Sequence, residues 1–164
     1  MLIGVVSDTH GYVDPRLIAA FAGVEAIIHA GDVCGEGVLE ALRELAPVYA
    51  VRGNNDDKLG DLGLPSHLDV VLDGIEPHVV HQLPEARLGA EARAVIFGHS
   101  HRPISEWRDG VLYLNPGAAG RSGFHALQTV ALLHIEGGEL RPELIELGAR
   151  EKLAPASRVK TPRR

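Results

Sequence analysis

The first third of the chain alternates short apolar runs with segments of helical periodicity. Three runs are typical of buried strands, at 2–7, 26–30 and 48–51. Between them, Asp14-Pro15 favours the start of one helix, and apolar residues at helical spacing over 38–45 predict a second helix that Pro47 ends. This order of strands and helices predicts a parallel sheet with right-handed crossovers.

The second half of the chain predicts antiparallel pairing. Further strands are expected at 68–72, 79–81 and 93–97, with a short helix at 84–90. Asp109-Gly110 and Gly137-Gly138 are each flanked by strand-like runs, which indicates two hairpins. Their strands are expected at 104–108, 111–115, 129–135 and 140–147. The architecture is therefore expected to be α/β with both parallel and antiparallel strands.

Length and composition indicate one globular domain. The chain has 164 residues, of which 45% are hydrophobic and 23% charged. The domain is expected to span 1–147, followed by a basic C-terminal tail at 148–164 that is expected to be a flexible, frayed terminus. The single cysteine, Cys34, excludes an intramolecular disulfide, and no apolar stretch of about 18 residues predicts a membrane span. A cytoplasmic protein without a signal peptide or membrane contact is expected.

Charge is unevenly distributed along the chain. The formal net charge is −6, but six basic residues against Glu151 give the segment 150–164 a charge of +5, so the remainder carries −11. Such an acidic body argues against nucleic acid as the main partner. It is compatible with divalent cations.

Polar side chains follow the predicted strands at the points where the strands end. Seven of them can bind a metal: Asp8, His10, Asp32, Asn54, His81, His99 and His101. In open α/β sheets the carboxyl ends of the strands form the ligand crevice, so these groups are expected to converge. Two carboxylates, one amide and four imidazoles are too many for one ordinary site and suit two divalent metals that share a carboxylate. Nitrogen and oxygen donors without thiolate favour Mn, Fe, Zn, Co or Ni over Ca.

The same residues lie in motifs that resemble those of a known family. The motifs are DTH (8–10), GD (31–32), GNND (53–56), VVH (79–81), GHSH (98–101) and NPG (115–117). In this order they resemble the calcineurin-like metallophosphoesterase superfamily, and the short chain is similar to its small bacterial and archaeal phosphodiesterases, which are relatives of a retromer subunit with the same fold. The resemblance implies an αββα sandwich with mixed sheets.

The resemblance also implies a dinuclear metal centre. Carried over by motif, one metal is held by Asp8, His10 and His101, the other by Asn54, His81 and His99, and Asp32 bridges them. Manganese is the first choice for both ions, with Ni, Zn, Fe, Co or Mg as alternatives. The implied activity is hydrolysis of a small phosphate ester, a diester rather than a monoester, by in-line attack of a metal-bound hydroxide. The alternative is a non-catalytic scaffold of the same fold that binds other proteins.

Three positions bear on catalysis and specificity. Asn55 stands where the family often has a histidine; it can donate a hydrogen bond to phosphate but cannot pass a proton. Arg121 follows a glycine-rich loop and is a candidate phosphate clamp or an ordinary surface arginine. Gln82 replaces the glycine typical of the small members. Asn55 and Arg121 are the candidate catalytic residues, and an exposed edge strand in a late hairpin would allow a homodimer.

Overall fold

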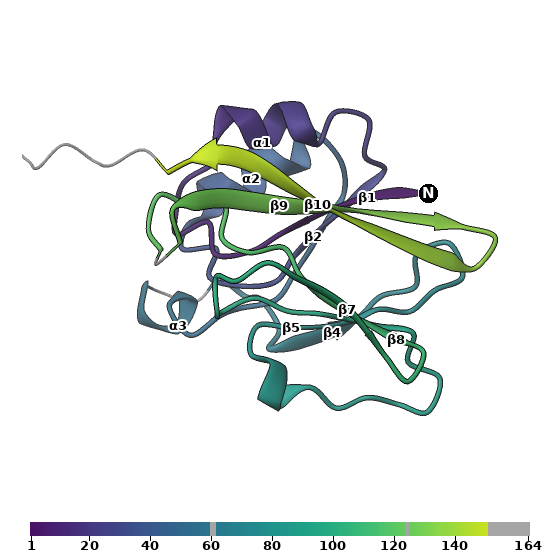
Figure 1. Ribbon diagram of the computed structural model, residues 1–164. Helices are drawn as coiled ribbons and strands as arrows, with labels where there is room; N and C mark the ends of the chain where they lie inside the picture. The colour runs from purple at the N-terminus through teal and green to yellow at the C-terminus, as the bar shows by residue number, and fades with distance from the viewer. Residues whose placement is uncertain (60–61, 124, 151–164) are drawn as a thin grey trace, which may run out of the picture.

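Two five-stranded sheets pack face to face (Figure 1). The computed structural model describes residues 1–59, 62–123 and 125–150. The first sheet has the order β10-β9-β1-β2-β3 and contains β1 (Leu2–Val6), β2 (Ala26–His29), β3 (Val48–Ala50), β9 (Leu127–Glu136) and β10 (Glu139–Ala149). The second sheet has the order β4-β5-β6-β8-β7 and contains β4 (His67–Asp69), β5 (His78–Val80), β6 (Ala94–Ile96), β7 (Ile104–Arg108) and β8 (Val111–Asn115).

Both sheets are mixed, as expected. In the first sheet β1, β2 and β3 are parallel, while β9 pairs antiparallel with β1 and β10 with β9. In the second sheet β5, β6 and β8 are parallel, and β4 and β7 are antiparallel edge strands. The two predicted hairpins therefore form, one in each sheet.

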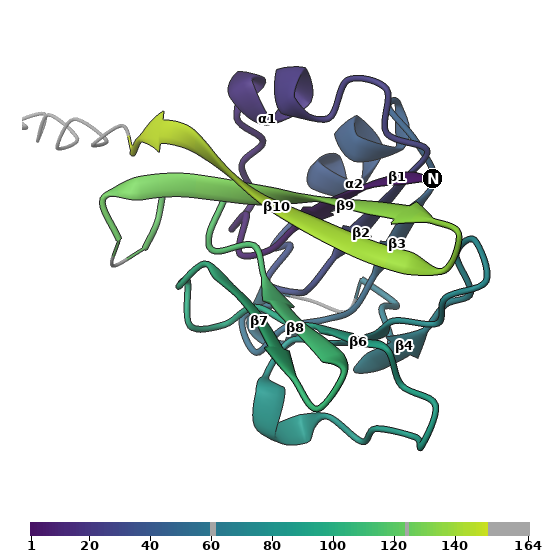
Figure 2. The ribbon, with the colours of Figure 1, turned by 45° about the vertical axis from the view of Figure 1, so that its right-hand side comes forward.

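Helices cover the outer face of the first sheet (Figure 2). They are α1 (Pro15–Ala20) and α2 (Glu36–Arg43). Asp14 caps α1, because its side chain accepts a hydrogen bond from the backbone N–H of Arg16 at 2.8 Å. The 3-10 turn η1 (Leu83–Glu85) and its flanking loop pack on the outer face of the second sheet, against Val80, Val95 and Phe97. The two packed sheets and the helices over the first sheet are those of the expected αββα sandwich, whereas a turn and a loop take the place of the outer helices on the second sheet.

Successive side chains of β1 point to opposite faces of the first sheet and so contribute to two different apolar clusters. Ile3 and Val5 point into the core between the two sheets, whereas Val6 belongs to the cluster beneath the helices. Gly4 also faces the helices, and a Cβ at this position would come within 2.8 Å of the Phe21 ring. Burial on both faces explains why β1 is apolar along its whole length.

Several elements differ from the sequence expectation. The strand expected at 68–72 is shorter, because a turn with positive φ at Asp73 and Gly74 pairs Leu72 with Ile75. The helix expected at 84–90 is only the η1 turn, because Ala86 already has an extended backbone. A short helix, α3 (Asp56–Leu59), was not expected.

The last strand also extends beyond the strand expected at 140–147. Strand β10 continues to Ala149, past the boundary expected at 147. The rest of the expected tail, 151–164, lies outside the described residues. None of the helices in the described part of the chain has the length and apolar character needed to cross a membrane.

Candidate metal centre

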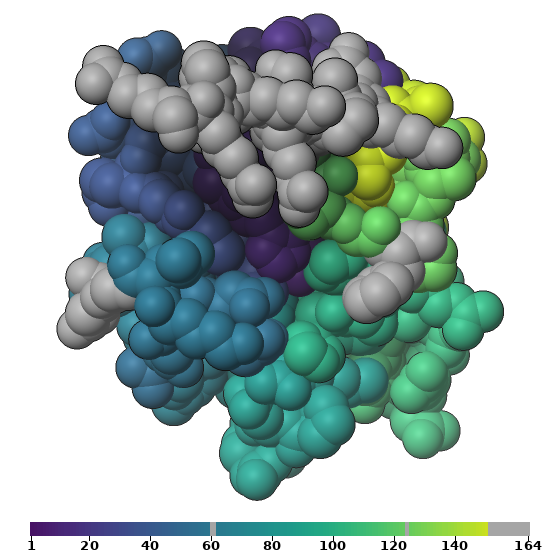
Figure 3. All heavy atoms as spheres, turned by 90° about the vertical axis from the view of Figure 1, so that its left-hand side faces the viewer, coloured from purple at the N-terminus to yellow at the C-terminus, as the bar shows by residue number. Residues whose placement is uncertain are grey.

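The loops that follow the strands are held together by backbone hydrogen bonds. The N–H of Asp8 donates to the carbonyl of Gly31 at 3.0 Å, and the N–H of His10 donates to that of Asp32 at 3.1 Å. Gly120 N–H donates to the carbonyl of Asp8 at 3.0 Å. The parallel pairing of β1 and β2 thus continues into their loops, at the left-hand edge of Figure 1. Figure 3 faces this edge, where purple residues from the start of the chain lie between teal and green segments.

In the buried Asp8 carboxylate, one oxygen accepts hydrogen bonds from described residues and the other does not. Its Oδ2 accepts hydrogen bonds from the Ser7 hydroxyl at 2.7 Å and from the backbone N–H of His99 at 3.1 Å. Its Oδ1 accepts no hydrogen bond from any described residue, although Nε2 of His101 lies 3.1 Å away. A buried, unsatisfied carboxylate oxygen beside an imidazole nitrogen suits a bound cation.

His10 and His101 complete the first group of donors. Their Nε2 atoms lie 3.4 Å apart, and Nε2 of His10 lies 3.9 Å from Asp8 Oδ1. On the other side of the His10 ring, Nδ1 lies 3.7 Å from the Cys34 sulfur. Burial lowers the pKa of His10 and outweighs the opposite effect of Asp32 and Asp8. His10 is therefore neutral near pH 7, the state in which an imidazole binds metal.

Asp32 lies between the first group of donors and the second. Its Oδ2 is 3.9 Å from His10 Nε2 and 3.5 Å from His81 Nε2. Asn55 donates to both of its oxygens, through the backbone N–H at 2.8 Å and through Nδ2 at 2.6 Å. Burial alone would raise the pKa of Asp32, but the hydrogen bond and charge of His81, followed by the bonds from Asn55, hold it well below its ordinary value.

His81 is oriented by the backbone of the neighbouring sheet. Its Nδ1 donates to the carbonyl of Ala30 at 2.7 Å, which turns Nε2 toward Asn54 Oδ1 at 3.1 Å. Burial lowers the pKa of His81, yet the hydrogen bond to Asp32 and the charges of Asp8 and Asp32 raise it overall. A carbonyl behind one ring nitrogen is the usual way of aiming the other at a metal. His99 adjoins this group, with Nδ1 at 2.9 Å from Asn54 Oδ1.

All seven side chains predicted from the sequence lie in one contiguous cluster. Two sets of three offer atoms within 4.8 Å of one another, namely Asp8, His10 and His101, and Asp8, Asp32 and His81. Asp8 belongs to both sets, whereas the assignment by motif gave Asp8 to one metal only and Asp32 as the shared ligand. Mixed carboxylate and imidazole donors at these separations fit divalent transition metals.

Most of the seven candidate ligands have left-handed backbone conformations, which are unfavourable for residues other than glycine. Five of the seven residues have φ between 48° and 66°: Asp8, His10, Asp32, His99 and His101. Left-handed backbone at residues other than glycine costs about 1–3 kcal/mol each and gathers at functional sites. The sequence carries little signal for this feature, apart from glycines next to the candidate ligands. A Cβ at one of them, Gly98, would collide with Ser7 and Asp8.

The two candidate catalytic residues lie in different surroundings. Asn55 lines a cleft of about 390 Å³ together with five of the seven candidate ligands, His10, Asp32, Asn54, His99 and His101. Arg121 instead lies over the Tyr12 ring, with its guanidinium carbon 3.8 Å from the ring centroid. Ser122 and Gly123, the next residues of its loop, do line the cleft. A role for Arg121 on phosphate stays a prediction.

Sequence reasoning missed several residues that support the centre. Ser7 is one, through its bond to Asp8. Arg150 is another, because its guanidinium donates to the carbonyls of Ser122 and His125, both at 3.0 Å, and so holds the loop at the edge of the cleft. Serine after a strand and arginine near a terminus are common, so neither carries a specific signal.

Asp56 ties two of the loops together. Its buried carboxylate accepts three backbone N–H bonds, from Cys34 and Gly53 at 2.7 Å and from Val33 at 3.2 Å. It therefore fixes the loop of Asp32 relative to the loop of Asn54.

Cys34 is suited to structure rather than to nucleophilic attack. Burial raises the pKa of its thiol to about 12, helped by the charges of Asp56 and Asp32. The thiolate, which is the reactive form, is therefore scarce near neutral pH.

Comparisons with known proteins agree with the geometry of the centre. The chain is 32% identical over 164 aligned residues to a protein of Methanothermobacter thermautotrophicus named "Probable metallophosphoesterase", covering 91% of this chain and 94% of the relative. A solved archaeal phosphodiesterase superposes with a TM-score of 0.72 at 29% identity, covering 88% of this chain and 100% of that one.

A second solved structure is similar in fold alone. Vps29 of Entamoeba histolytica, as a single mutant, superposes with a TM-score of 0.72 at 19% identity, covering 89% of this chain and 99% of that one. The sequence profile of the calcineurin-like phosphoesterase superfamily domain matches residues 1–138. With the fold, the candidate metal ligands and this match in agreement, the chain belongs to the calcineurin-like phosphoesterase superfamily.

Proposed function

We propose that the protein is a phosphodiesterase that depends on two divalent metal ions and hydrolyses small phosphate esters by in-line attack of water. One observation carries the proposal: the buried Oδ1 of Asp8 has no hydrogen-bond donor among the described residues, while Nε2 atoms of His101, His10 and His81 lie 3.1, 3.9 and 4.0 Å from it. A carboxylate oxygen so placed is costly to bury unless a cation occupies the space between these groups.

The metal ligands are proposed to divide as the motifs imply. Asp8, His10 and His101 would hold one ion, Asn54, His81 and His99 would hold the other, and Asp32 would contact both. Manganese is proposed for both positions. A metal pair of this kind activates water near neutral pH and stabilises charge on the phosphate oxygens.

The protein's own groups supply orientation. Asn55 fixes the Asp32 carboxylate through two hydrogen bonds, which add to the larger effect of His81 in lowering the pKa of this carboxyl. The Ser7 hydroxyl holds the other oxygen of Asp8, so that Oδ1 remains directed at the imidazoles. A neutral amide at Asn55 cannot protonate the leaving group at pH 7, so esters with good leaving groups are preferred.

Hydrolysis of bis-p-nitrophenyl phosphate and p-nitrophenyl phosphate tests the proposal. After chelation and re-addition of Mn, Ni, Co, Zn or Mg, we expect activity to return only with metal and to be higher on the diester. Asp32→Ala and His99→Ala should lose it, and the matched control His134→Ala, at the far end of β9, should keep it. Activity that survives complete chelation would contradict the proposal.

The alternative is a protein-binding scaffold, and the likeness to Vps29 is the observation behind it. That likeness extends to the fold alone, whereas the cluster of seven competent donors favours an enzyme. Hydrolysis by the metal-loaded protein distinguishes the two, because bound metal alone is compatible with both, as a Vps29 solved with Zn²⁺ illustrates. About two equivalents of bound metal together with metal-dependent hydrolysis support the phosphodiesterase. Bound metal without hydrolysis, or no bound metal under metal-replete conditions, supports the scaffold.

A further inference from the structure

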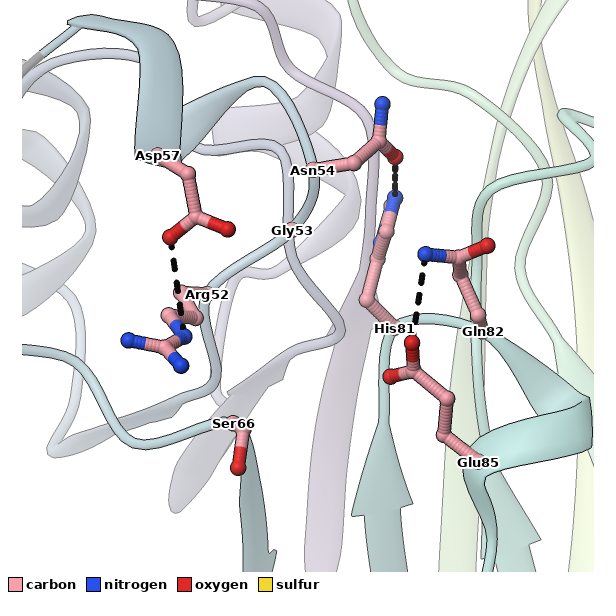
Figure 4. A pocket seen from close by; sticks show the side chains of 8 residues that line it. All are labelled: Arg52, Gly53, Asn54, Asp57, Ser66, His81, Gln82 and Glu85. Carbon is pink, nitrogen blue, oxygen red and sulfur yellow. Dashed lines mark hydrogen bonds and ion pairs between the residues drawn. The ribbon is translucent and has the colours of Figure 1, made fainter.

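A second cleft, of about 350 Å³, opens beside the metal centre (Figure 4). Two of its lining residues, Asn54 and His81, are candidate metal ligands, so a molecule in this cleft reaches the metal centre directly. The other described residues of its wall are Arg52, Gly53, Asp57, Ser66, Gln82 and Glu85. We refer to it as the Gln82 cleft.

The wall of the Gln82 cleft is built from loosely paired donors and acceptors. Gln82 Nε2 donates to Glu85 Oε1 at 3.4 Å, and Arg52 Nε lies 3.6 Å from Asp57 Oδ1. Both separations exceed the 2.7–3.2 Å of ordinary hydrogen bonds. Figure 4 shows Gln82 and Glu85 on one side of the cleft and Arg52, Asp57 and Ser66 on the other. Each pair can therefore bind a ligand group that both donates and accepts a hydrogen bond.

Hydroxyl groups have this property, since each carries one donor and two acceptor positions. A ligand with an anionic group besides its phosphate fits less well, because the wall contains two carboxylates, Asp57 and Glu85, and one guanidinium, that of Arg52. A nucleobase lacks a stacking surface, since His81 is the sole ring among the described lining residues. The same shortage of aromatic rings disfavours a quaternary ammonium group. The wall thus matches a neutral, hydroxylated chain.

A different space adjoins the metal cleft at His10 and Asn55. A hollow of about 230 Å³ lies there, lined by His10, Cys34, Asn55, Lys58 and Leu59. It shares no described lining residue with the Gln82 cleft. An ester bound at the metal centre can therefore extend one arm into each, with the departing alcohol beside Asn55.

We infer that the Gln82 cleft binds the polyol arm of a phosphodiester, such as a glycerol or sugar unit, and retains it through hydrolysis. This inference rests on the proposed function. Water adds to phosphorus, the bond to the other alcohol breaks, and that alcohol leaves with a proton. The polyol monophosphate remains as the second product. Gln82 and Glu85 determine specificity and do not touch the reacting atoms.

Two esters with the same leaving group test the inference. Glyceryl p-nitrophenyl phosphate and ethyl p-nitrophenyl phosphate differ only in the retained arm. We expect kcat/KM to favour the glyceryl ester by about 10-fold, and the preference to fall below about 3-fold in Gln82→Ala/Glu85→Ala, because each lost hydrogen bond removes a factor of several. Glu40→Ala, on the exposed face of α2, is the matched control and should keep the preference.

A binding measurement separates failure of this inference from failure of the proposed function. Calorimetry on the Mn-loaded protein should give tighter binding for glycerol 1-phosphate than for ethyl phosphate. Equal kcat/KM and equal Kd within each pair would overturn the polyol site, as would a preference for p-nitrophenyl phosphorylcholine over the glyceryl ester. If neither ester is hydrolysed, the proposed function fails, and the comparison of Kd values still decides whether the cleft recognises a polyol.

Discussion

His10 and His101 face each other beside the Asp8 carboxylate, with their Nε2 atoms 3.4 Å apart. Two charged imidazoles would repel at this distance, whereas two neutral ones can share a hydrogen bond if one Nε2 carries the proton. With the proton of each ring on Nδ1, both Nε2 lone pairs are available to a cation beside Asp8. Protons therefore compete with a metal for this pair.

Metal affinity should fall as the pH is lowered. The pKa of His81 is raised by its hydrogen bond to Asp32 and by the charges of Asp8 and Asp32, which outweigh burial. A protonated His81 must lose its proton before Nε2 can bind a metal, so the Mn affinity should drop by about tenfold per pH unit below this pKa. Calorimetry in buffers of different ionisation enthalpy measures the released protons. His81→Asn should release fewer, and pH-independent binding by the unchanged protein would refute the coupling.

Asp56 should matter more for stability than its neighbour. Asp56→Ala leaves the N–H groups of Val33, Cys34 and Gly53 without their acceptor, which should lower the free energy of unfolding by about 3 kcal/mol. Urea unfolding of the metal-free protein measures this. Asp57→Asn is the control, because the Asp57 side chain is 61% exposed, and it should change stability by less than about 0.5 kcal/mol. Equal effects at both positions would show that Asp56 does not hold the loops.

His29 should make the fold sensitive to acid. Its ring is buried, Gly31 N–H donates to its Nδ1 at 3.2 Å, and Nε2 lies 3.0 Å from the Thr9 hydroxyl. Burial lowers the pKa of His29 from 6.5 to about 4, despite the opposing charges of Asp8 and Asp56. Between these values the unfolded chain binds a proton that the folded chain does not, so stability rises with pH across this window.

The size of this effect is open to measurement. Acidification from pH 7 to pH 4 should remove roughly 3 kcal/mol of stability through His29. Denaturant unfolding at several pH values, compared with His29→Gln, isolates this contribution, since glutamine can accept from Gly31 and donate to Thr9 without titrating. The variant should have the shallower pH dependence below pH 6.5, and parallel curves for the two proteins would count against a buried neutral histidine.

Asn55 should make the rate depend steeply on the leaving group. Because an amide cannot donate a proton at pH 7, charge on the departing oxygen is not neutralised by this side chain. A series of substituted phenyl phosphodiesters should show rates that fall steeply as the pKa of the phenol rises. Asn55→His should flatten this dependence, whereas Asn55→Ala should keep it steep. If the rate depends equally on the pKa of the phenol in all three proteins, Asn55 does not lie beside the leaving group.

Much of the centre follows from sequence because parallel strands end at a common edge. The carboxylates Asp8 and Asp32 follow neighbouring parallel strands, so their convergence needs no knowledge of side-chain packing. The hydrogen bonding of the Asp8 carboxylate cannot be predicted in the same way. Which oxygen of Asp8 remains free is set by the Ser7 hydroxyl and by loop backbone with positive φ. Likewise, Arg121 lies over Tyr12 through contacts between loops distant in sequence.

The most direct test of the metal centre is anomalous diffraction at the Mn edge from crystals grown with Mn. We predict two peaks about 3.5–4 Å apart. One should be bound by Asp8, His10 and His101, the other by Asn54, His81 and His99, with Asp32 contacting both. A single peak, or none at these side chains under saturating Mn, would contradict the dinuclear centre.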